Sequence, residues 1–214
     1  MTRNLTVIGA ALGAAGTALA VDVTGGQTSV LLDTTTLSAA ASLDLSGVSG
    51  DVISPGTLPG SVAFGINSRT DSPATTFSYD PSDFLGTFSG TIEHMGSVFF
   101  NSDTVEVGDF SIGFDAGRVG GDRSGFFVES TAGIAAILFD VSNPSTLAAT
   151  ASSLTIGADL LVSAEFAQFL LDNQLATADL TGADVGDALV EAVPAPGAAA
   201  LFGLAGLGIA RRRR

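Results

Sequence analysis

The sequence contains no cysteine, no lysine and no tryptophan, and it has a single histidine and a single tyrosine. The absence of cysteine excludes disulfide bonds, thiol nucleophiles and zinc sites built on thiolates. Without lysine or cysteine, a base-activated nucleophile would depend on His94, and no G-x-S-x-G motif precedes it. We expect His94 to lie at the surface, beside a turn at a strand end. The inventory indicates a non-enzymatic protein.

Positive charge is scarce in the central part of the chain. All 22 acidic residues lie between Asp22 and Glu191, whereas only Arg69, Arg118 and Arg123 lie there, which gives this part a formal charge of −19. Such a domain repels nucleic acids, so we exclude nucleic acid as a partner. The charge can attract divalent cations at a surface, but adaptation to saline surroundings explains it equally well.

Residues 1–20 have the three parts of a secretory signal peptide. Arg3 supplies the positive charge, the apolar region follows, and Ala18-Leu19-Ala20 forms an A-x-A cleavage site. An uncleaved N-terminal anchor is the alternative. The pattern predicts export, with cleavage after Ala20.

The C-terminal residues 193–214 combine a proline motif, an apolar run and a basic block. From Val193 to Ala210 no residue is charged, and as a helix this stretch would be about 27 Å long, close to the ~30 Å hydrocarbon thickness of a bilayer. The block Arg211, Arg212, Arg213 and Arg214 marks the cytoplasmic end. Because Pro194 and Pro196 cannot continue a helix interior, we predict a C-terminal membrane helix that starts near Gly197 or Ala198, the alternative being a core helix with a solvated end.

This order of features resembles the PEP-CTERM sorting signal. The motif reads Val193, Pro194, Ala195, Pro196, with Ala195 where that family usually has glutamate. The resemblance covers only the C-terminal segment. It implies a membrane-embedded processing enzyme of the exosortase type as partner, transient residence in the inner membrane, and a final place at the cell surface or outside the cell.

The body, residues 21–192, is long enough for one hydrophobic core. Many short runs alternate apolar and polar residues between Gly, Pro, Asp and Ser, as in antiparallel strands with one buried face. These runs occupy 37–45, 62–66, 77–79, 88–100, 105–114, 125–130, 134–141, 147–156, 159–162 and 184–192. The change of parity at Gly108-Asp109 predicts a bulge.

One segment breaks the alternation. Phe166, Phe169 and Leu170 are spaced i, i+3 and i+4, which predicts a short helix over 164–172. Nine to eleven strands with one short helix predict an all-β fold, an antiparallel two-sheet β-sandwich of jelly-roll type. An up-and-down barrel is the alternative.

Calcium is the most plausible ligand that the body's own residues indicate. Asp80 and Asp83 lie in a turn, and Asp115 and Asp122 flank a glycine-rich loop; all four offer hard oxygen ligands. None matches the EF-hand spacing, so solvated turns in which Asp caps backbone amides explain them as well.

Other charged residues allow further interpretations. A carboxylate pair such as Asp103 and Asp109, or Glu93 with a neighbour, could serve a glycoside hydrolase. Arg118 and Arg123 flank Gly120-Gly121, and we expect them to pair with local carboxylates rather than with an anionic ligand.

The sequence as a whole predicts an exported, non-enzymatic surface or matrix protein sorted by its C-terminal segment. The alternatives are a calcium-dependent or polysaccharide-binding module and a secreted carboxylate-based hydrolase.

Overall fold

The computed structural model describes residues 20–196. Twelve strands form its main part, with three α-helices and one 3-10 helix between them. In chain order they are β1 Val21–Leu32, α1 Thr34–Ala41, β2 Leu45–Val48, β3 Val62–Gly65, β4 Ser78–Tyr79, α2 Phe84–Thr87, β5 Ile92–Glu93, β6 Ser97–Phe100, β7 Val105–Phe114, η1 Ala116–Arg118, β8 Arg123–Gly133, β9 Ala136–Ser142, β10 Thr146–Ala149, β11 Leu154–Val162, α3 Ala164–Asp172 and β12 Asp184–Pro196.

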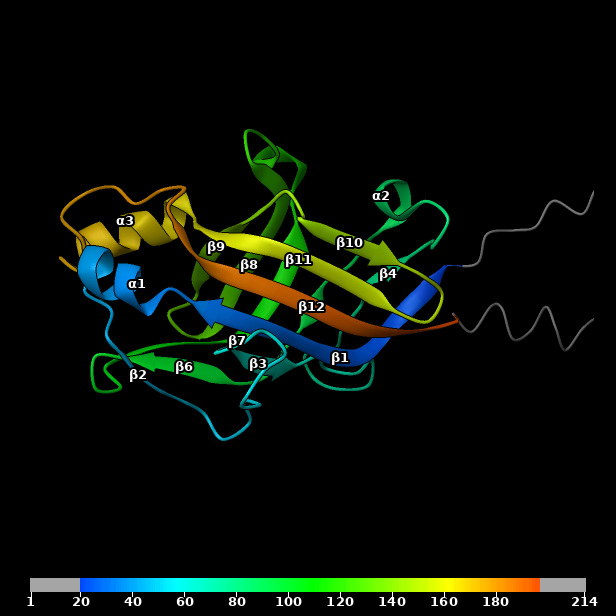
Figure 1. Cartoon of the computed structure of the whole chain (residues 1–214), viewed down its shortest axis with the longest axis horizontal. Helices are drawn as coiled ribbons and strands as arrows, with labels where there is room; N and C mark the ends of the chain where they lie inside the picture. The colour runs from blue at the N-terminus through cyan, green and yellow to red at the C-terminus, as the bar shows by residue number, and fades with distance from the viewer. Residues whose placement is uncertain (1–19, 197–214) are drawn as a thin grey trace, which may run out of the picture.

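The strands form one antiparallel sheet in the order β2-β6-β7-β8-β9-β11-β12-β1-β3. β10 pairs with β11, β4 with β1 and β5 with β7. The sheet curls strongly on itself, as a half-barrel, so that its inner face encloses the core (Figure 1). The prediction of an antiparallel all-β fold is confirmed.

The prediction of two separate sheets in a jelly-roll sandwich is wrong. β7, β8 and β9 continue into β11 and β12 through unbroken strand pairing, so one sheet supplies both walls of the core. Alternating residues show which face is buried, but they do not show whether facing walls belong to one sheet or two.

Backbone hydrogen bonds connect the two ends of the strand order. Ile66 N–H donates to the Gly26 carbonyl, and Asn67 N–H donates to the Glu93 carbonyl. The His94 N–H then donates to the Phe110 carbonyl of β7. β1 is thereby linked through short segments to β5 and β7, which closes the curl on this side.

The segment predicted as a strand over 37–45 begins instead as helix α1. The Asp33 carboxylate accepts hydrogen bonds from the Thr35 and Thr36 amides at 3.1 and 3.0 Å, which caps the first turn. Leu37 and Ala41, four residues apart, are buried on one face, and Ser42 ends the helix with φ 49°. Residues four apart lie on the same face of a strand and also of a helix, so the spacing of Leu37 and Ala41 fits both. The Asp33 cap decides in favour of the helix.

The helix predicted over 164–172 is confirmed as α3. The Ser163 hydroxyl accepts a hydrogen bond from the Phe166 amide at 3.0 Å, and Phe166 and Leu170 are buried. α3 packs on β9, whose Leu138, Phe139 and Asp140 are all buried, so β9 is covered on both faces. α1 and α3 lie at the same end of the curled sheet (Figure 1).

The bulge predicted at Gly108-Asp109 is not borne out, because the β7–β8 register is the same on both sides of Asp109. Asp109 has φ 46° and lacks a pairing partner in β8, while Gly108 and Phe110 on either side of it are paired. At this point the other neighbour of β7 changes from β6 to β5.

Within residues 20–196, the structure has no helix long and apolar enough to cross a membrane. The predicted membrane helix and the arginine block Arg211 to Arg214 lie outside the described residues, as do most of the predicted signal peptide and its Ala18.

The first and last strands, β1 and β12, share the longest antiparallel pairing in the sheet, from Val21↔Pro196 to Leu32↔Gly186. Gly26 lies in this pairing with φ 120°, and a Cβ there would overlap the Glu191 carbonyl oxygen. The close approach of the two backbones therefore requires glycine.

We expect Gly26→Ala to lower the free energy of unfolding by about 2 to 4 kcal/mol, because the side chain combines a strained φ with a backbone overlap. Gly25→Ala is the matched control, since a Cβ at Gly25 meets no atom within 4 Å. Urea denaturation measures both. Equal destabilisation by the two variants would contradict the register described here.

Candidate binding groove

A groove of about 540 Å³ lies at the end of the body opposite α1 and α3. Here β9 ends, β10 continues along β11, and β8 is not paired with β9 between Arg123 and Phe127. The groove opens between them, with α2 at its side. Its walls are mainly apolar, and its volume is that of a pocket for a small molecule. The principal lining residues are Phe84, Phe88, Phe114, Phe126, Leu147 and Ile156.

A cluster of phenylalanines builds one wall of the groove. The Phe88 ring centroid lies 4.9 Å from that of Phe114, edge to face, and 5.0 Å from that of Phe126. Phe88 also stacks against Phe77 at 6.1 Å. Phe114 and Phe126 are directly opposite each other in the β7–β8 pair. The cluster is anchored in the core on one side and reaches the surface through Phe114.

Local hydrogen bonds place α2 against this cluster. The Asp83 carboxylate caps α2 by accepting from the Gly86 amide at 3.2 Å, and Asp80 accepts from the Ser82 amide at 2.8 Å. The cap fixes Phe84 in the core and leaves the next residue, Leu85, 71% exposed at the edge of the groove. On the same side, the Tyr79 hydroxyl donates to the Thr150 carbonyl at 2.7 Å.

The corner between β9 and β10 forms the opposite side of the groove. Asn143 N–H donates to the Asp122 carbonyl at 2.6 Å, and Asn143 Nδ2 donates to the Gly121 carbonyl at 3.4 Å. The Ser124 hydroxyl donates to the Val141 carbonyl at 2.8 Å. Asn143 and Ser124 are the polar side chains that line the groove, and both are used to hold the 117–124 loop to the corner.

Of the four aspartates predicted as calcium ligands, Asp80 and Asp83 lie just before α2, and Asp115 and Asp122 lie in the segment between β7 and β8. Asp80, Asp83 and Asp115 accept hydrogen bonds from the backbone amides of Ser82, Gly86 and Gly117, as capping residues do. Residues 20–196 contain no group of three or more acidic or histidine side chains that could hold a metal ion. Calcium binding stays a prediction.

The charge around the groove is negative. Asp83 adjoins Gly86, and Asp115 follows Phe114 in the chain. The Asp122 backbone carbonyl accepts a hydrogen bond from the Asn143 N–H. The nearest guanidinium in sequence, that of Arg123, lies 3.4 Å from the Asp140 carboxylate. None of these carboxylates lines the groove itself, but that of Asp83 lies beside the lining residue Gly86.

Arg118 and Arg123 pair with carboxylates, as predicted. Arg118 Nη1 lies 2.7 Å from Asp140 Oδ1, and Arg118 also contacts the Glu165 carboxylate of α3. Asp140 is 2% exposed, and its second oxygen receives Arg123. Although burial opposes the charge of Arg118, the hydrogen bond and charge of Asp140 raise its pKa. The cluster joins η1, β8, β9 and α3.

The three carboxylates considered for glycoside hydrolysis each have a hydrogen-bond partner, and none of them lines the groove. Asp103 accepts from the Ser46 hydroxyl at 2.7 Å, Asp109 from the Gly96 amide at 3.1 Å, and Glu93 from the Ser111 hydroxyl at 3.0 Å.

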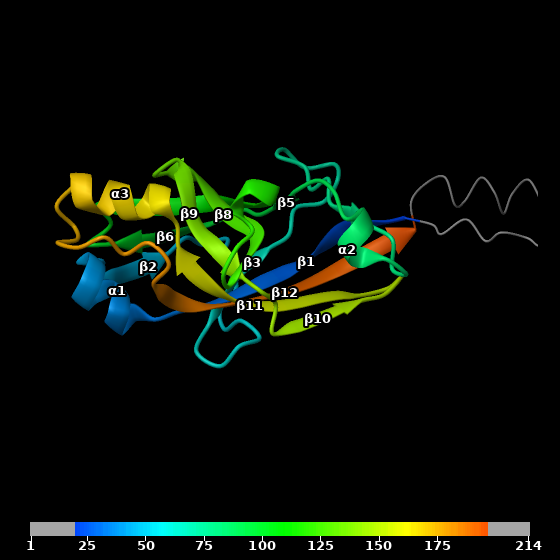
Figure 2. The ribbon, with the colours of Figure 1, turned by 90° about the horizontal axis from the view of Figure 1, so that it is seen from above.

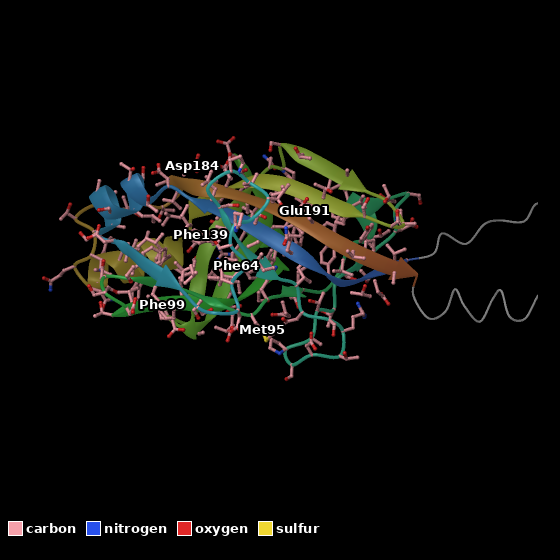
Figure 3. The ribbon with its side chains drawn as sticks, turned by 60° about the horizontal axis from the view of Figure 1, so that its bottom comes forward. Phe64, Met95, Phe99, Phe139, Asp184 and Glu191 are labelled. Atoms are coloured by element: carbon pink, nitrogen blue, oxygen red, sulfur yellow. The ribbon has the colours of Figure 1, made fainter. Side chains whose placement is uncertain are left out.

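His94 lies in the core, and its predicted surface position is wrong. It is 1% exposed and shares the inner face of the sheet with Ile92, two residues earlier. Residues two apart in a strand point to the same side, so the apolar position of Ile92 was the available signal. Both residues line an internal cavity of about 90 Å³. Figure 3 shows Phe64 and Phe139, which line it as well, inside the curl of the sheet.

Both ring nitrogens of His94 have partners. Nδ1 lies 3.0 Å from the Phe110 carbonyl oxygen, and Nε2 lies 2.8 Å from the Thr28 hydroxyl. A carbonyl only accepts, so Nδ1 carries the proton and Nε2 accepts from Thr28. Burial lowers the pKa of His94 to about 4, so the ring is neutral at pH 7. The ring therefore hydrogen-bonds the Thr28 hydroxyl and the Phe110 carbonyl inside an otherwise apolar core.

The groove residues were not found from the sequence because they come from α2, β7, β8, β10 and β11 and from the segments between them. The 14 phenylalanines in a chain without tryptophan were the only compositional signal. Alternation placed Phe114 and Phe126 on strands, but it did not show that these strands meet Phe88 and Leu147 at an opening in the sheet.

We expect acid to destabilise the fold through His94. An unfolded histidine has a pKa near 6.5, whereas burial holds that of His94 at about 4. The stability that depends on neutral His94 is therefore complete above about pH 6.5. It is lost as the pH falls from about 6.5 to 4, with a total of about 3 kcal/mol. Urea denaturation at stepped pH values measures this loss.

His94→Gln provides the comparison, because glutamine is polar but does not titrate. Its free energy of unfolding should change less over this pH interval than that of the wild type, while the carboxylates contribute equally to both. The same slope in both proteins would show that His94 does not control the acid response.

We expect Asp140→Asn to lower the free energy of unfolding by about 3 kcal/mol, because it leaves Arg118 largely buried without its main counter-charge. Asp22→Asn is the control. The Asp22–Arg69 pair is 3.6 Å apart and partly exposed, and its loss should change stability by less than about 1 kcal/mol. Thermal and urea denaturation compare the two, and a small effect at Asp140 would exclude the cluster as a structural link.

No protein-family model and no curated protein sequence matches this chain. Among solved structures, the fold is similar to the crystal structure of the C-terminal domain of HtaA from Corynebacterium glutamicum. The TM-score is 0.50 at 14% sequence identity, and the match covers 81% of this chain and 99% of that domain. At this identity the similarity concerns the fold alone: both chains have this β-rich architecture.

Proposed function

We propose that this chain is an exported, non-enzymatic surface or matrix protein, sorted through its PEP-CTERM-like C-terminal segment by a processing enzyme of the exosortase type. The body would be the exported cargo, and the segment after Pro196 would hold it in the inner membrane until it is processed. The observation that carries this proposal is the pairing of the first strand with the last.

β1 and β12 bring the two ends of the body to one place. Val21, the first residue after the predicted cleavage site, pairs with Pro196 of the predicted sorting motif. Both strand ends lie at the same end of the body (Figures 1 and 2). A leader before Val21 and a membrane segment after Pro196 can therefore reach the same membrane surface without crossing the body. This arrangement supports sorting by both segments.

The predicted motif forms the last part of β12. Val23 pairs with Pro194 and Asp22 with Ala195, and the Thr24 hydroxyl donates to the Val193 carbonyl at 3.0 Å. β11 pairs with β12 only as far as Ala192, so beyond that point β12 has a single neighbour, β1, in the described part of the chain. Proline is tolerated where no strand requires its missing N–H. A processing enzyme would have to displace this strand end from β1.

The environment of His94 supports a non-enzymatic role. It is buried and neutral, and both of its ring nitrogens are hydrogen-bonded inside the core. General acid–base chemistry requires a group that reaches a substrate. His94 does not line the groove.

We expect the double substitution Pro194→Ala and Pro196→Ala to block processing, because the motif is the feature that the enzyme would recognise. The full-length form should then accumulate in the membrane fraction, which immunoblotting of cell fractions detects. Pro59→Ala, in an exposed loop, is the control and should be processed like the wild type.

Because Pro194 is buried in β12, the thermal unfolding of the variant should be measured as well. A second variant, with Arg211 to Arg214 replaced by serine, tests the same signal without touching the body. Normal release of both variants would overturn the proposed sorting.

A further inference from the structure

We propose that the groove between α2, β8 and β10 is a binding site for a small, ring-bearing hydrophobic molecule that is cationic or uncharged. The inference concerns the body alone and does not depend on how the chain is sorted. Three properties of the groove support it: its apolar residues are exposed, its walls are aromatic, and its surroundings are acidic.

Exposed apolar side chains gather at the groove. Residues 20–196 contain eight large hydrophobic side chains that are exposed, and Leu85, Phe114 and Leu147 line the groove. Their exposed fractions are 71%, 40% and 41%. Apolar surface of this kind, when it is contiguous and concave, marks ligand sites, because covering it releases about 25 cal/mol per Å².

The shape of the groove favours a flat ligand. Phe88, Phe114 and Phe126 stand at 4.9 to 5.3 Å from one another, two of the three contacts being edge to face. Rings in such a cluster present both faces and edges to a molecule above them, and aromatic ligands pair with them in the same geometries. The volume of about 540 Å³ admits a molecule of two or three rings.

The floor of the groove can adapt to its ligand. Phe126, Pro144 and Ile156 line both the groove and the internal cavity of about 90 Å³. When a ligand ring presses on Phe126, this side chain can therefore move into the free volume of the cavity behind it. A well-packed core would resist such a displacement.

The charged residues near the groove favour a ligand that is cationic or uncharged. The Asp83 carboxylate accepts from the amide of the lining residue Gly86, and Asp115 follows Phe114 in the chain. Arg123, next to Ser124 in the chain, is engaged with Asp140. The Ser124 hydroxyl and the Asn143 amide, which could bind an anion, donate to backbone carbonyls. A carboxylate or sulfonate would meet negative charge without a matching donor from these side chains. A cation over the aromatic rings is attracted both by the rings and by the carboxylates.

The experiment is a fluorescence titration of the purified full chain with three ring-bearing dyes: cationic thioflavin T, uncharged Nile red and the anionic anilinonaphthalene sulfonate. We expect saturable binding of the first two and at least tenfold weaker binding of the third. Tighter binding of the anionic dye than of thioflavin T would overturn the proposal.

The variant Leu85→Arg tests the location. It places a cation at the edge of the groove on a side chain that is already exposed, so the fold should persist. Thioflavin T should bind at least tenfold more weakly, and the anionic dye should bind more tightly. Leu45→Arg is the matched control, since Leu45 is 45% exposed on β2, away from the groove (Figure 1), and should leave all three affinities unchanged.

Dye that binds elsewhere, including the apolar ends of the chain, responds equally to both variants. An equal response would therefore refute the groove as the site while leaving the proposed sorting unaffected.

Discussion

The antiparallel pairing of β1 with β12 is the interaction on which the rest of the structure depends. It joins the first strand, from Val21 to Leu32, to the last strand, from Pro196 back to Gly186. β12 carries β11 on its other side, and β1 carries β3 and β4, so the pairing joins these three strands to the other nine strands of the sheet. Without it, β1 and β12 would each present an unpaired edge, and short links such as those through Ile66 and Asn67 would have to hold β1 to the rest of the sheet.

Once this pairing is made, the curl of the sheet determines the other features. Its interior must be apolar, which is why His94 is neutral and hydrogen-bonded there. α1 and α3 cover one end, and the Arg118–Asp140–Arg123 cluster fastens α3 and the 117–124 loop to β9. At the other end β9 stops at Ser142, β10 takes its place on β11, and the groove remains between β10 and β8. The same pairing also places the predicted sorting motif next to Val21.

Features that depend on neighbouring residues could be predicted from the sequence. The spacing of Phe166, Phe169 and Leu170 predicted α3, and alternation predicted most of the strands. The strand predicted at 37–45 was wrong because the residues from Leu37 to Ala41 fit either period, and the capping carboxylate of Asp33 decides in favour of a helix. The surface position predicted for His94 overlooked that it shares a face with Ile92. The single sheet and the groove depend on contacts between segments far apart in the chain, such as Phe88 with Phe126, which no local pattern reveals.

The central claim is that β1 and β12 close the body and bring its two ends together. Because the natural chain has no cysteine, Asp22→Cys and Ala195→Cys create the only two thiols for nitroxide spin labels. Asp22 and Ala195 are direct partners in the sheet, so their Cα atoms should lie about 5 Å apart. The continuous-wave electron paramagnetic resonance spectrum of the doubly labelled protein should show strong dipolar broadening relative to the two single-label proteins. A spectrum equal to the sum of the two single-label spectra would contradict the account.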